Sequence, residues 1–184
     1  MMRRGAAEHG SAPSRAERCD PLDTLVKEHD QGLLYLGQLS EAVEDIRSHG
    51  FSVAAFIRIG EAIAFIDTTI RRHNEKEEEI LLPLIGRHLP DSPREIRREH
   101  RALWAVFAEL RKHVQDIEDG RLRGSAITDL MQSACAVVEV LRDHIIKENE
   151  ELFPAAKVLL TGEEYRELAE GIARASESTS IASR

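Results

Sequence analysis

Two histidines and one glutamate in the first half of this sequence each return 71 residues later. In both halves the glutamate follows the second histidine by four residues. Imidazole nitrogen and carboxylate oxygen are ligands with which proteins bind first-row transition metals. An internal repeat that duplicates such residues predicts one metal site built from two copies of the same unit. The six predicted ligands are His29, His73 and Glu77 in the first copy and His100, His144 and Glu148 in the second.

Helical geometry explains why a spacing of four residues suits two ligands of one site. Residues four apart on an α-helix differ in direction by about 40°, so an imidazole and a carboxylate project from one face. Both copies also have glutamate six positions after the histidine, but six residues turn the direction by about 240°. At the fifth position the copies differ, with Glu78 in one and Asn149 in the other. Only the fourth position is therefore both acidic and inward in each copy.

Four histidines in one layer argue for a metal centre more strongly than a single histidine does. A lone buried histidine is more often bonded to a backbone carbonyl and has only a structural role. Burying four imidazoles and two carboxylates without a cation would carry severe desolvation costs. A dinuclear metal site satisfies all six groups together. The remaining histidines are not predicted to bind metal, and they are His9, His49, His88 and His113.

Four long helices are predicted to hold these ligands, because apolar residues recur at helical spacing and helix-forming residues dominate. Their short connections predict an all-α, up-down-up-down antiparallel four-helix bundle that brings the four histidines to one level. A short fifth helix with a packing role can be capped by Thr161 and Glu164. The four expected helices run from Asp20 to about Gly50, through Ile59 to about Gly86, from Ser92 to about Gly120, and from about Ser125 to about Pro154.

The length and composition indicate one folded domain with a tail at each end. Residues 1–19 are rich in Ala, Gly, Ser and Arg and lack apolar periodicity, and residues 175–184 are small and polar. Both stretches are expected to be disordered. The metal-binding bundle is expected to span residues 20–174.

Charge, hydropathy and cysteine content argue against several classes of protein. A formal net charge of −8 disfavours a nucleic-acid partner, because binding phosphates needs clustered lysine and arginine. No apolar signal segment follows Arg4 and no stretch approaches 18 apolar residues, so no membrane association is expected. Cys19 and Cys135 are too few for a disulfide framework and favour a reducing compartment. The protein is expected to be soluble and cytoplasmic.

The repeated motifs resemble those of the hemerythrin-like HHE cation-binding domains, over about residues 20–174. The resemblance implies a left-turning four-helix bundle around a non-haem di-iron centre. Each of two iron ions would take two histidines, both glutamates would bridge the irons, and an oxo or hydroxo group would lie between them. The motifs stand here as His29, His73-Asn-Glu-Lys-Glu77 followed by Leu-Leu-Pro, His100, and His144-Ile-Ile-Lys-Glu148 followed by Leu-Phe-Pro.

One position departs from the oxygen-carrying members of the family that the motifs resemble. Those proteins have a fifth histidine four residues after the ligand that corresponds to His100, and this sequence has Trp104 there. With four histidines each iron can keep an open position, so the resemblance implies bridging chemistry with oxygen, peroxide or nitric oxide rather than simple carriage. Trp104 is also the kind of large residue that fills the core of a bundle.

Three kinds of function remain open, and each takes a small-molecule ligand. The first is an enzyme-like di-iron protein that acts on oxygen, peroxide or nitric oxide in a stress response. The second is a sensing module, in which iron or oxygen changes the stability of the bundle and a redox or signalling partner reads the change. The third is reversible binding or storage of oxygen or iron without turnover.

The sequence also leaves the metal and the accessory residues open. Zinc or manganese can occupy the same ligands as iron. Ferritin-like bundles are disfavoured, because they place glutamate three residues before histidine and no histidine here has that neighbour. No catalytic acid or base is predicted, and neither Tyr35 nor Tyr165 is assigned to chemistry. Glu28 and Glu99, each just before a ligand histidine, either orient neighbouring side chains or face solvent.

Overall fold

The computed structural model describes residues 20–121 and 124–182. Helix accounts for 89% of them, and no β-strand is present within these two ranges. The predicted all-α class is therefore confirmed. The expected N-terminal tail, residues 1–19, lies outside the described residues.

The first long segment is α1 (Pro21–His49), and its two ends follow the signals in the sequence. The Asp20 carboxylate accepts a hydrogen bond from the backbone N–H of Leu22 at 3.0 Å, and Pro21 occupies the first turn, where no donor is needed. Gly50 ends the helix with a φ of 86°, which glycine adopts without strain. The buried face between these ends carries His29 among leucines.

The second long segment is a continuous helical rod in which two stretches have π-helical hydrogen bonding. Pro83 lies just after the second stretch and cannot donate the regular helical bond, and a wider π-helical turn lets the rod continue past it. In the first stretch the Thr68 hydroxyl donates to the Ala64 carbonyl at 2.7 Å, which competes with regular pairing. The parts are α2 (Val53–Phe65), η2 (Ile66–Ile70), α3 (Arg71–Lys76), η3 (Glu77–Leu81) and α4 (Leu82–Ile85).

The second half of the chain repeats this arrangement. The third long segment is α5 (Ser92–Glu118), and the fourth consists of α6 (Ala126–Lys147), η4 (Glu148–Leu152) and α7 (Phe153–Leu159). The π-helical stretches η3 and η4 occupy equivalent positions of the repeat, and a proline follows each of them after one residue. The two copies therefore share a backbone irregularity as well as side chains.

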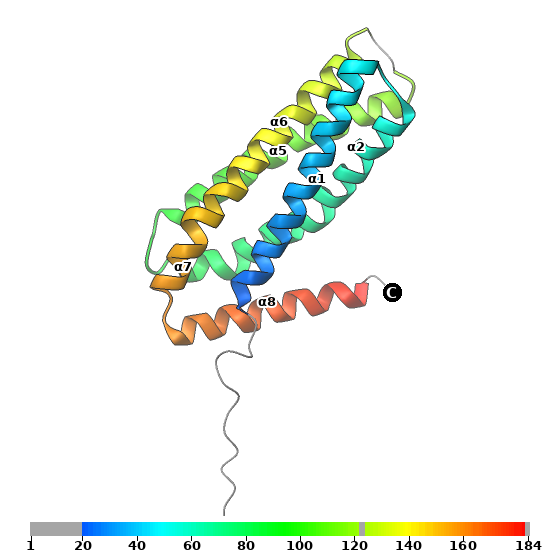
Figure 1. Cartoon of the computed structure of the whole chain (residues 1–184). Helices are drawn as coiled ribbons and strands as arrows, with labels where there is room; N and C mark the ends of the chain where they lie inside the picture. Colours follow the sequence, from blue (N-terminus) through cyan, green and yellow to red (C-terminus); the bar gives the residue numbers. More distant parts are fainter. Residues whose placement is uncertain (1–19, 122–123, 183–184) are drawn as a thin grey trace, which may run out of the picture.

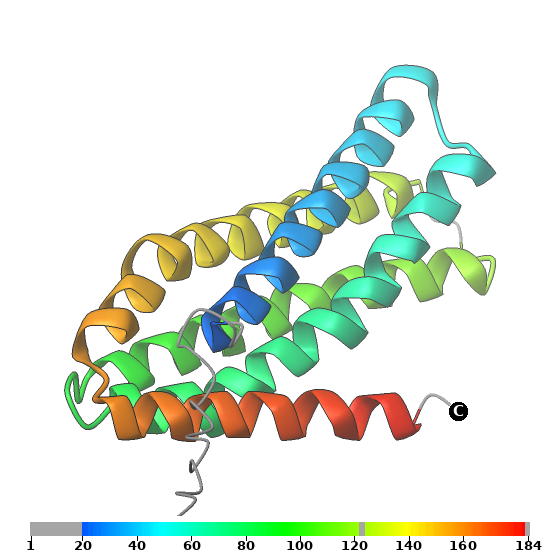
Figure 2. The same ribbon diagram turned by 60° about the horizontal axis from the view of Figure 1, so that its bottom comes forward.

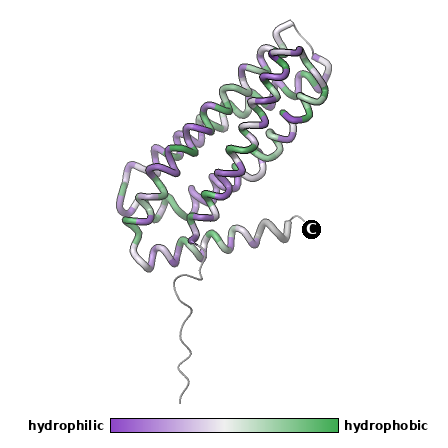
Figure 3. The backbone as a smooth tube through the Cα atoms, viewed as in Figure 1, coloured by the Kyte–Doolittle hydropathy of each residue, from purple (hydrophilic) through white to green (hydrophobic). Residues whose placement is uncertain are grey.

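The four long segments lie side by side, with consecutive segments in contact and α1 also against α6 (Figure 1). Hydrophobic and hydrophilic residues interleave along each of them, so that one face of every segment is buried (Figure 3). The buried hydrophobic side chains form two clusters. The larger one, which we name the apolar layer, includes Leu36, Phe107 and Val137, and the smaller end cluster includes Leu22, Leu81 and Phe153.

The fifth helix, α8 (Gly162–Ala182), crosses the end of the four segments and contacts α1 and η3 (Figures 1 and 2). Its start has the predicted cap, because the Glu164 carboxylate accepts from the Thr161 N–H at 3.0 Å and the Thr161 hydroxyl accepts from the Glu164 N–H at 3.3 Å. The helix is longer than predicted and occupies most of the stretch 175–184 that the sequence suggests is disordered. Small polar residues can extend a helix that docking has already nucleated.

Candidate metal centre

The six predicted ligands meet in one layer, to which all four long segments contribute. Every one of them is at most 4% exposed. Their ligand atoms form two groups of four, and within each group the atoms lie within 4.8 Å of one another. The first group is His29, His73, Glu77 and Glu148, and the second is Glu77, His100, His144 and Glu148.

The two glutamates belong to both groups and lie between the two pairs of histidines. The Oε atoms of Glu77 are 3.3 Å from Nε2 of His73 and 3.4 Å from Nε2 of His100. Each carboxylate therefore faces one histidine of each pair, which is the arrangement that a ligand bridging two metal ions needs. The corresponding contacts of Glu148 are with Nε2 of His29 at 3.2 Å and with Nε2 of His144 at 3.3 Å.

The atoms that face the centre of this layer have no hydrogen-bond partner among the described residues, although all are buried. They are Nε2 of the four histidines and both oxygens of the two glutamates. The contacts between them are close but lack the angles that a hydrogen bond requires. Buried polar atoms in proteins are nearly always paired, so a converging set of unpaired nitrogens and oxygens fits cations. Two metal ions, one in each group, would satisfy all of these atoms.

The outer nitrogens of two ligand histidines are held by carboxylates from the neighbouring helix. Nδ1–H of His73 donates to Glu28 at 3.0 Å, and Nδ1–H of His144 donates to Glu99 at 3.2 Å. A carboxylate only accepts, so Nδ1 carries a proton and Nε2 is the nitrogen that faces the centre and would bind a metal ion in its deprotonated form. Of the two roles considered for Glu28 and Glu99, the structure supports orientation of neighbouring side chains.

A lysine from each copy holds the far oxygen of these carboxylates. Lys76 Nζ contacts Glu28, and Lys147 Nζ lies 2.6 Å from Glu99. Hydrogen bonds from His144 and Lys147 lower the pKa of Glu99 to about 2. Burial acts to raise the pKa of Glu28, but hydrogen bonds from His73 and Lys76 lower it below its usual value. Both carboxylates therefore stay ionised and act only as acceptors.

The other two ligand histidines have partners that the sequence analysis did not assign. Nδ1–H of His29 donates to Oδ1 of Asn149 at 2.8 Å, and Nδ1–H of His100 donates to Oε1 of Glu78 at 2.7 Å. Asn149 and Glu78 are the fifth-position residues at which the two copies differ. The sequence signal that could have pointed to these two partners is their place directly after a ligand glutamate in both copies.

The buried groups of the centre perturb one another's protonation. Burial and the neighbouring His73 lower the pKa of His29 to about 4. Burial also acts to lower the pKa of His73, but the charges of Glu77 and Glu28 outweigh it and raise this pKa to about 9. Burial and the charge of Glu77 raise the pKa of Glu148 well above its usual value. These shifts in opposite directions reflect strong interactions between ionisable groups that are buried close together.

Asn74 is a further buried polar residue beside the centre. Its side chain is 3% exposed, and neither amide atom has a hydrogen-bond partner among the described residues. The equivalent residue of the second copy is Ile145, also buried. Sequence reasoning did not single out Asn74, since one asparagine next to His73 carries no signal of its own.

Trp104 occupies a half-buried position at the edge of the apolar layer. Its ring meets Phe107 edge-on with centroids 5.5 Å apart, and the Arg71 guanidinium lies 3.9 Å from the ring centroid. Arg71 is itself paired with Asp67 at 2.5 Å. Trp104 therefore fills the core under an arginine, in agreement with its core-filling interpretation, and brings no ligand atom to the centre.

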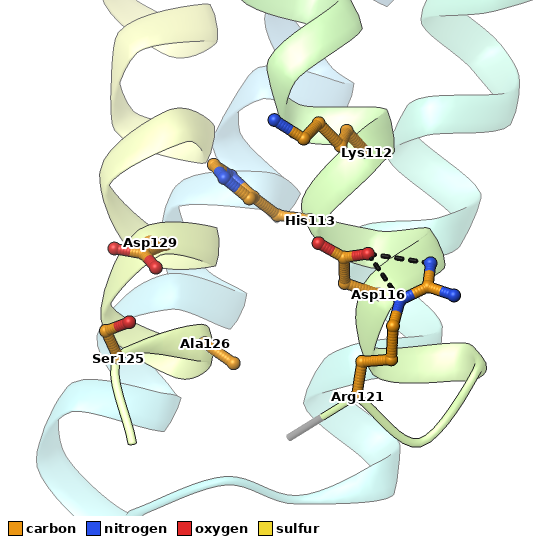
Figure 4. Close-up of a pocket in the computed structure, with 7 residues that line it drawn as sticks. All are labelled: Lys112, His113, Asp116, Arg121, Ser125, Ala126 and Asp129. Atoms are coloured by element: carbon orange, nitrogen blue, oxygen red, sulfur yellow. Dashed lines mark hydrogen bonds and ion pairs between the residues drawn. The ribbon is translucent and has the colours of Figure 1, made fainter. Parts of the chain in front are cut away.

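Two hollows in the surface lie away from the six residues. The first, of about 320 Å³, lies between α5 and α6 and is lined by polar side chains including His113, Asp116 and Arg121 (Figure 4). The second, of about 840 Å³, lies beside the start of α8. None of the six residues lines either hollow. The remaining described histidines contact other groups, namely Asp45 for His49, Glu164 for His88 and Ser133 for His113.

Comparison with known proteins gives one family match. The model described as Hemerythrin HHE cation binding domain matches residues 86–177, which is half of the 184-residue chain. The matched part includes His100, His144 and Glu148. A comparison with curated proteins found no match. In the described part of the chain, no helix combines the length and the apolar character needed to cross a membrane.

Proposed function

The chain belongs to the hemerythrin HHE cation-binding domain family, and we propose that it is a di-iron protein that acts on or responds to oxygen, peroxide or nitric oxide. The observation that carries the proposal is the pair of four-residue groups that share both glutamates. The proposal also assigns the four long segments the up-down-up-down order of a hemerythrin-like bundle. Iron is the proposed metal because two histidines and bridging carboxylates suit it, and zinc and manganese are the competing ions.

The number of ligands supports a centre that can take up a further small molecule. Each proposed metal position has two histidines and two shared carboxylates, and Trp104 adds no fifth imidazole. With four protein ligands, each ion would have room for a further small ligand. Because the six side chains are at most 4% exposed, only a small molecule can reach them without unfolding the layer. Oxygen, peroxide and nitric oxide meet this requirement.

The residues around the ligands have separable roles in this proposal. Bound iron supplies one-electron redox chemistry. Glu77 and Glu148 hold the two positions together, and Glu28 and Glu99 keep the histidine lone pairs directed inward. The end cluster and the apolar layer exclude bulk water from either side. A dry, oriented site of this kind strengthens the electrostatic interactions within it.

A sensing function without turnover is the second candidate, and the docking of α8 favours it. A Cβ atom at Gly171 would lie 2.6 Å from Cγ2 of Ile80, so α8 packs closely on η3, which begins at Glu77. Metal binding to unpaired ligands is linked to stability. Occupancy of the centre can therefore change how firmly α8 is held, and a partner protein can read that change.

The test loads the protein anaerobically with ferrous iron and follows its reaction with oxygen, peroxide and nitric oxide. The matched variant is Glu77→Gln, which keeps the shape of a proposed bridging ligand and removes its charge. The enzyme proposal predicts multiple turnovers with at least one of these molecules in the wild type and none in the variant. Iron-loaded protein without turnover but with altered protection of α8 against amide exchange would support sensing. A visible band that appears and disappears reversibly with oxygen would support carriage instead.

A further inference from the structure

Each ligand histidine makes a hydrogen bond through Nδ1, on the side away from the centre. These bonds are equivalent in the two copies of the repeat for one histidine of each copy and differ for the other. The Glu28 contact with His73 corresponds to the Glu99 contact with His144, and each of these carboxylates is also held by a lysine. The exception is the partner of the remaining histidine in each group. It is the amide of Asn149 for His29 and the carboxylate of Glu78 for His100.

Asn149 and Glu78 have nearly the same geometry but different charge. Their acceptor oxygens lie 2.8 Å and 2.7 Å from the respective Nδ1 atoms, so both fix the same tautomer. Only Glu78 adds a negative charge behind the imidazole. Arg97 lies 3.7 Å from the other oxygen of Glu78, and both side chains are more than a third exposed, so this contact screens the charge only partly.

The backbone of the two copies differs on the same side of the centre. The π-helical stretch η2 ends three residues before His73, while the equivalent residues 137–141 belong to the regular helix α6. The residue after His73 is the unpaired Asn74, and its equivalent is the apolar Ile145. The surroundings of His29 and His73 are therefore less regular, as well as less negatively charged, than those of His100 and His144.

We propose that the two metal positions are unequal, with tighter binding at His100 and His144 and weaker, exchangeable binding at His29 and His73. Asn149 is the positioning residue that sets this difference. The inference rests on the proposed dinuclear centre and adds an order of filling to it. A carboxylate behind a ligand histidine increases its basicity, and loss of such a partner typically costs about 10- to 100-fold in metal affinity.

The test is a titration with Co²⁺ alone, followed by calorimetry and by visible absorption, which needs neither iron nor turnover. The wild type should show two binding steps whose affinities differ by about 10- to 100-fold. The isosteric change Asn149→Asp should bring the weaker step close to the tighter one. The reverse change, Glu78→Gln, should weaken the tighter step and leave two weak ones. Both side chains lie outside the innermost layer, and circular dichroism verifies that the variants remain folded.

Replacing one histidine of either group, in separate variants, shows which metal position gives rise to each binding step. His29→Gln should delete the weaker step and keep the tighter one, and His144→Gln should do the opposite. Two equal steps in the wild type, or an unchanged weak step in Asn149→Asp, would overturn the inequality while leaving a dinuclear centre in place. A protein that binds no Co²⁺, Fe²⁺ or Zn²⁺ would instead overturn the proposed function and this inference with it.

Discussion

The apolar layer and the layer of the six predicted ligands, which we name the ligand layer, lie on the same helices. They differ in whether their buried atoms have suitable partners. In the apolar layer, side chains such as Leu36, Phe107 and Val137 are fully or almost fully buried against one another. In the ligand layer, six equally buried side chains direct unpaired nitrogen and oxygen atoms toward one another. The first arrangement stabilises the fold in any condition. The second is costly without a cation and therefore indicates a function.

The largest effect is expected from a large-to-small change in the apolar layer. Phe107 is 1% exposed, and Phe107→Ala should lower the free energy of unfolding by about 3–5 kcal/mol because it leaves a cavity. Urea denaturation with and without metal measures this loss, which should be the same in both conditions. Val158→Ala is the matched control, since Val158 is 82% exposed and its truncation should cost little. A loss that disappears on adding metal would show that the two layers are not independent.

In the ligand layer, Glu148→Gln is expected to lower stability only when metal is present. At a metal concentration 100-fold above its dissociation constant, the wild type should gain about 2.7 kcal/mol of stability, and the variant should gain almost none. Without metal the variant should be at least as stable as the wild type, because burial and the nearby Glu77 already raise the pKa of Glu148 and favour its neutral form. Thermal melts at several metal concentrations measure both quantities. An equal metal response in the two proteins would remove Glu148 from the centre.

A smaller change, this time a gain in stability, is expected at Asn74. Its amide atoms are buried and unpaired like those of the ligand layer, but Asn74 is not a proposed ligand. Asn74→Ile installs the residue of the second copy and should raise the stability of the metal-free protein by about 1 kcal/mol, because a buried unpaired amide is removed. Urea denaturation measures the change, with Gln132→Ile at an exposed position of α6 as control. A clear loss of stability would mean that the amide has a partner in solution.

The most local effect is expected outside both layers, at the cap of α8. Hydrogen bonds from the Thr161 backbone and from His88 lower the pKa of Glu164 to about 2, against a usual value of 4.5. A lowered carboxyl pKa stabilises the folded state above pH 4.5, and this stabilisation is lost as the pH falls toward 2. The protection factors of the amides along α8, which are corrected for the pH dependence of intrinsic exchange, should therefore fall over this range before those of the long segments do. The variant Glu164→Gln should remove that pH dependence, and an unchanged profile would contradict the assignment.

Much of the difference between the apolar layer and the ligand layer was predictable, because each layer has a recognisable pattern in the sequence. The apolar layer appears as hydrophobic residues at helical spacing, which predicted the all-α class and the approximate ends of the four segments. The ligand layer appears as repeated residue types whose spacing can be compared between two copies. That comparison selected the glutamates that the structure brings together with the histidines. Metal binding by these residues remains a prediction.

The features that could not be predicted depend on contacts between helices or on the course of the backbone. Asn149 and Glu78 were noted only as a difference between the copies, because their histidine partners lie on other segments. The stretch η2, in which the Thr68 hydroxyl donates to the Ala64 carbonyl, has no proline or other marker in the sequence that would predict it. The docking of α8 on η3, where Gly171 comes close to Ile80, is a contact between segments that the sequence pattern does not specify.

The number and coupling of bound irons test the central claim most directly. The measurement is anaerobic loading with ferrous iron, removal of unbound metal, and determination of iron per chain, followed by Mössbauer spectroscopy after oxidation. The dinuclear centre predicts two irons per chain that form one spin-coupled pair, and none retained in Glu148→Gln. One iron per chain, or two uncoupled irons, would contradict a centre in which Glu77 and Glu148 serve both metal positions.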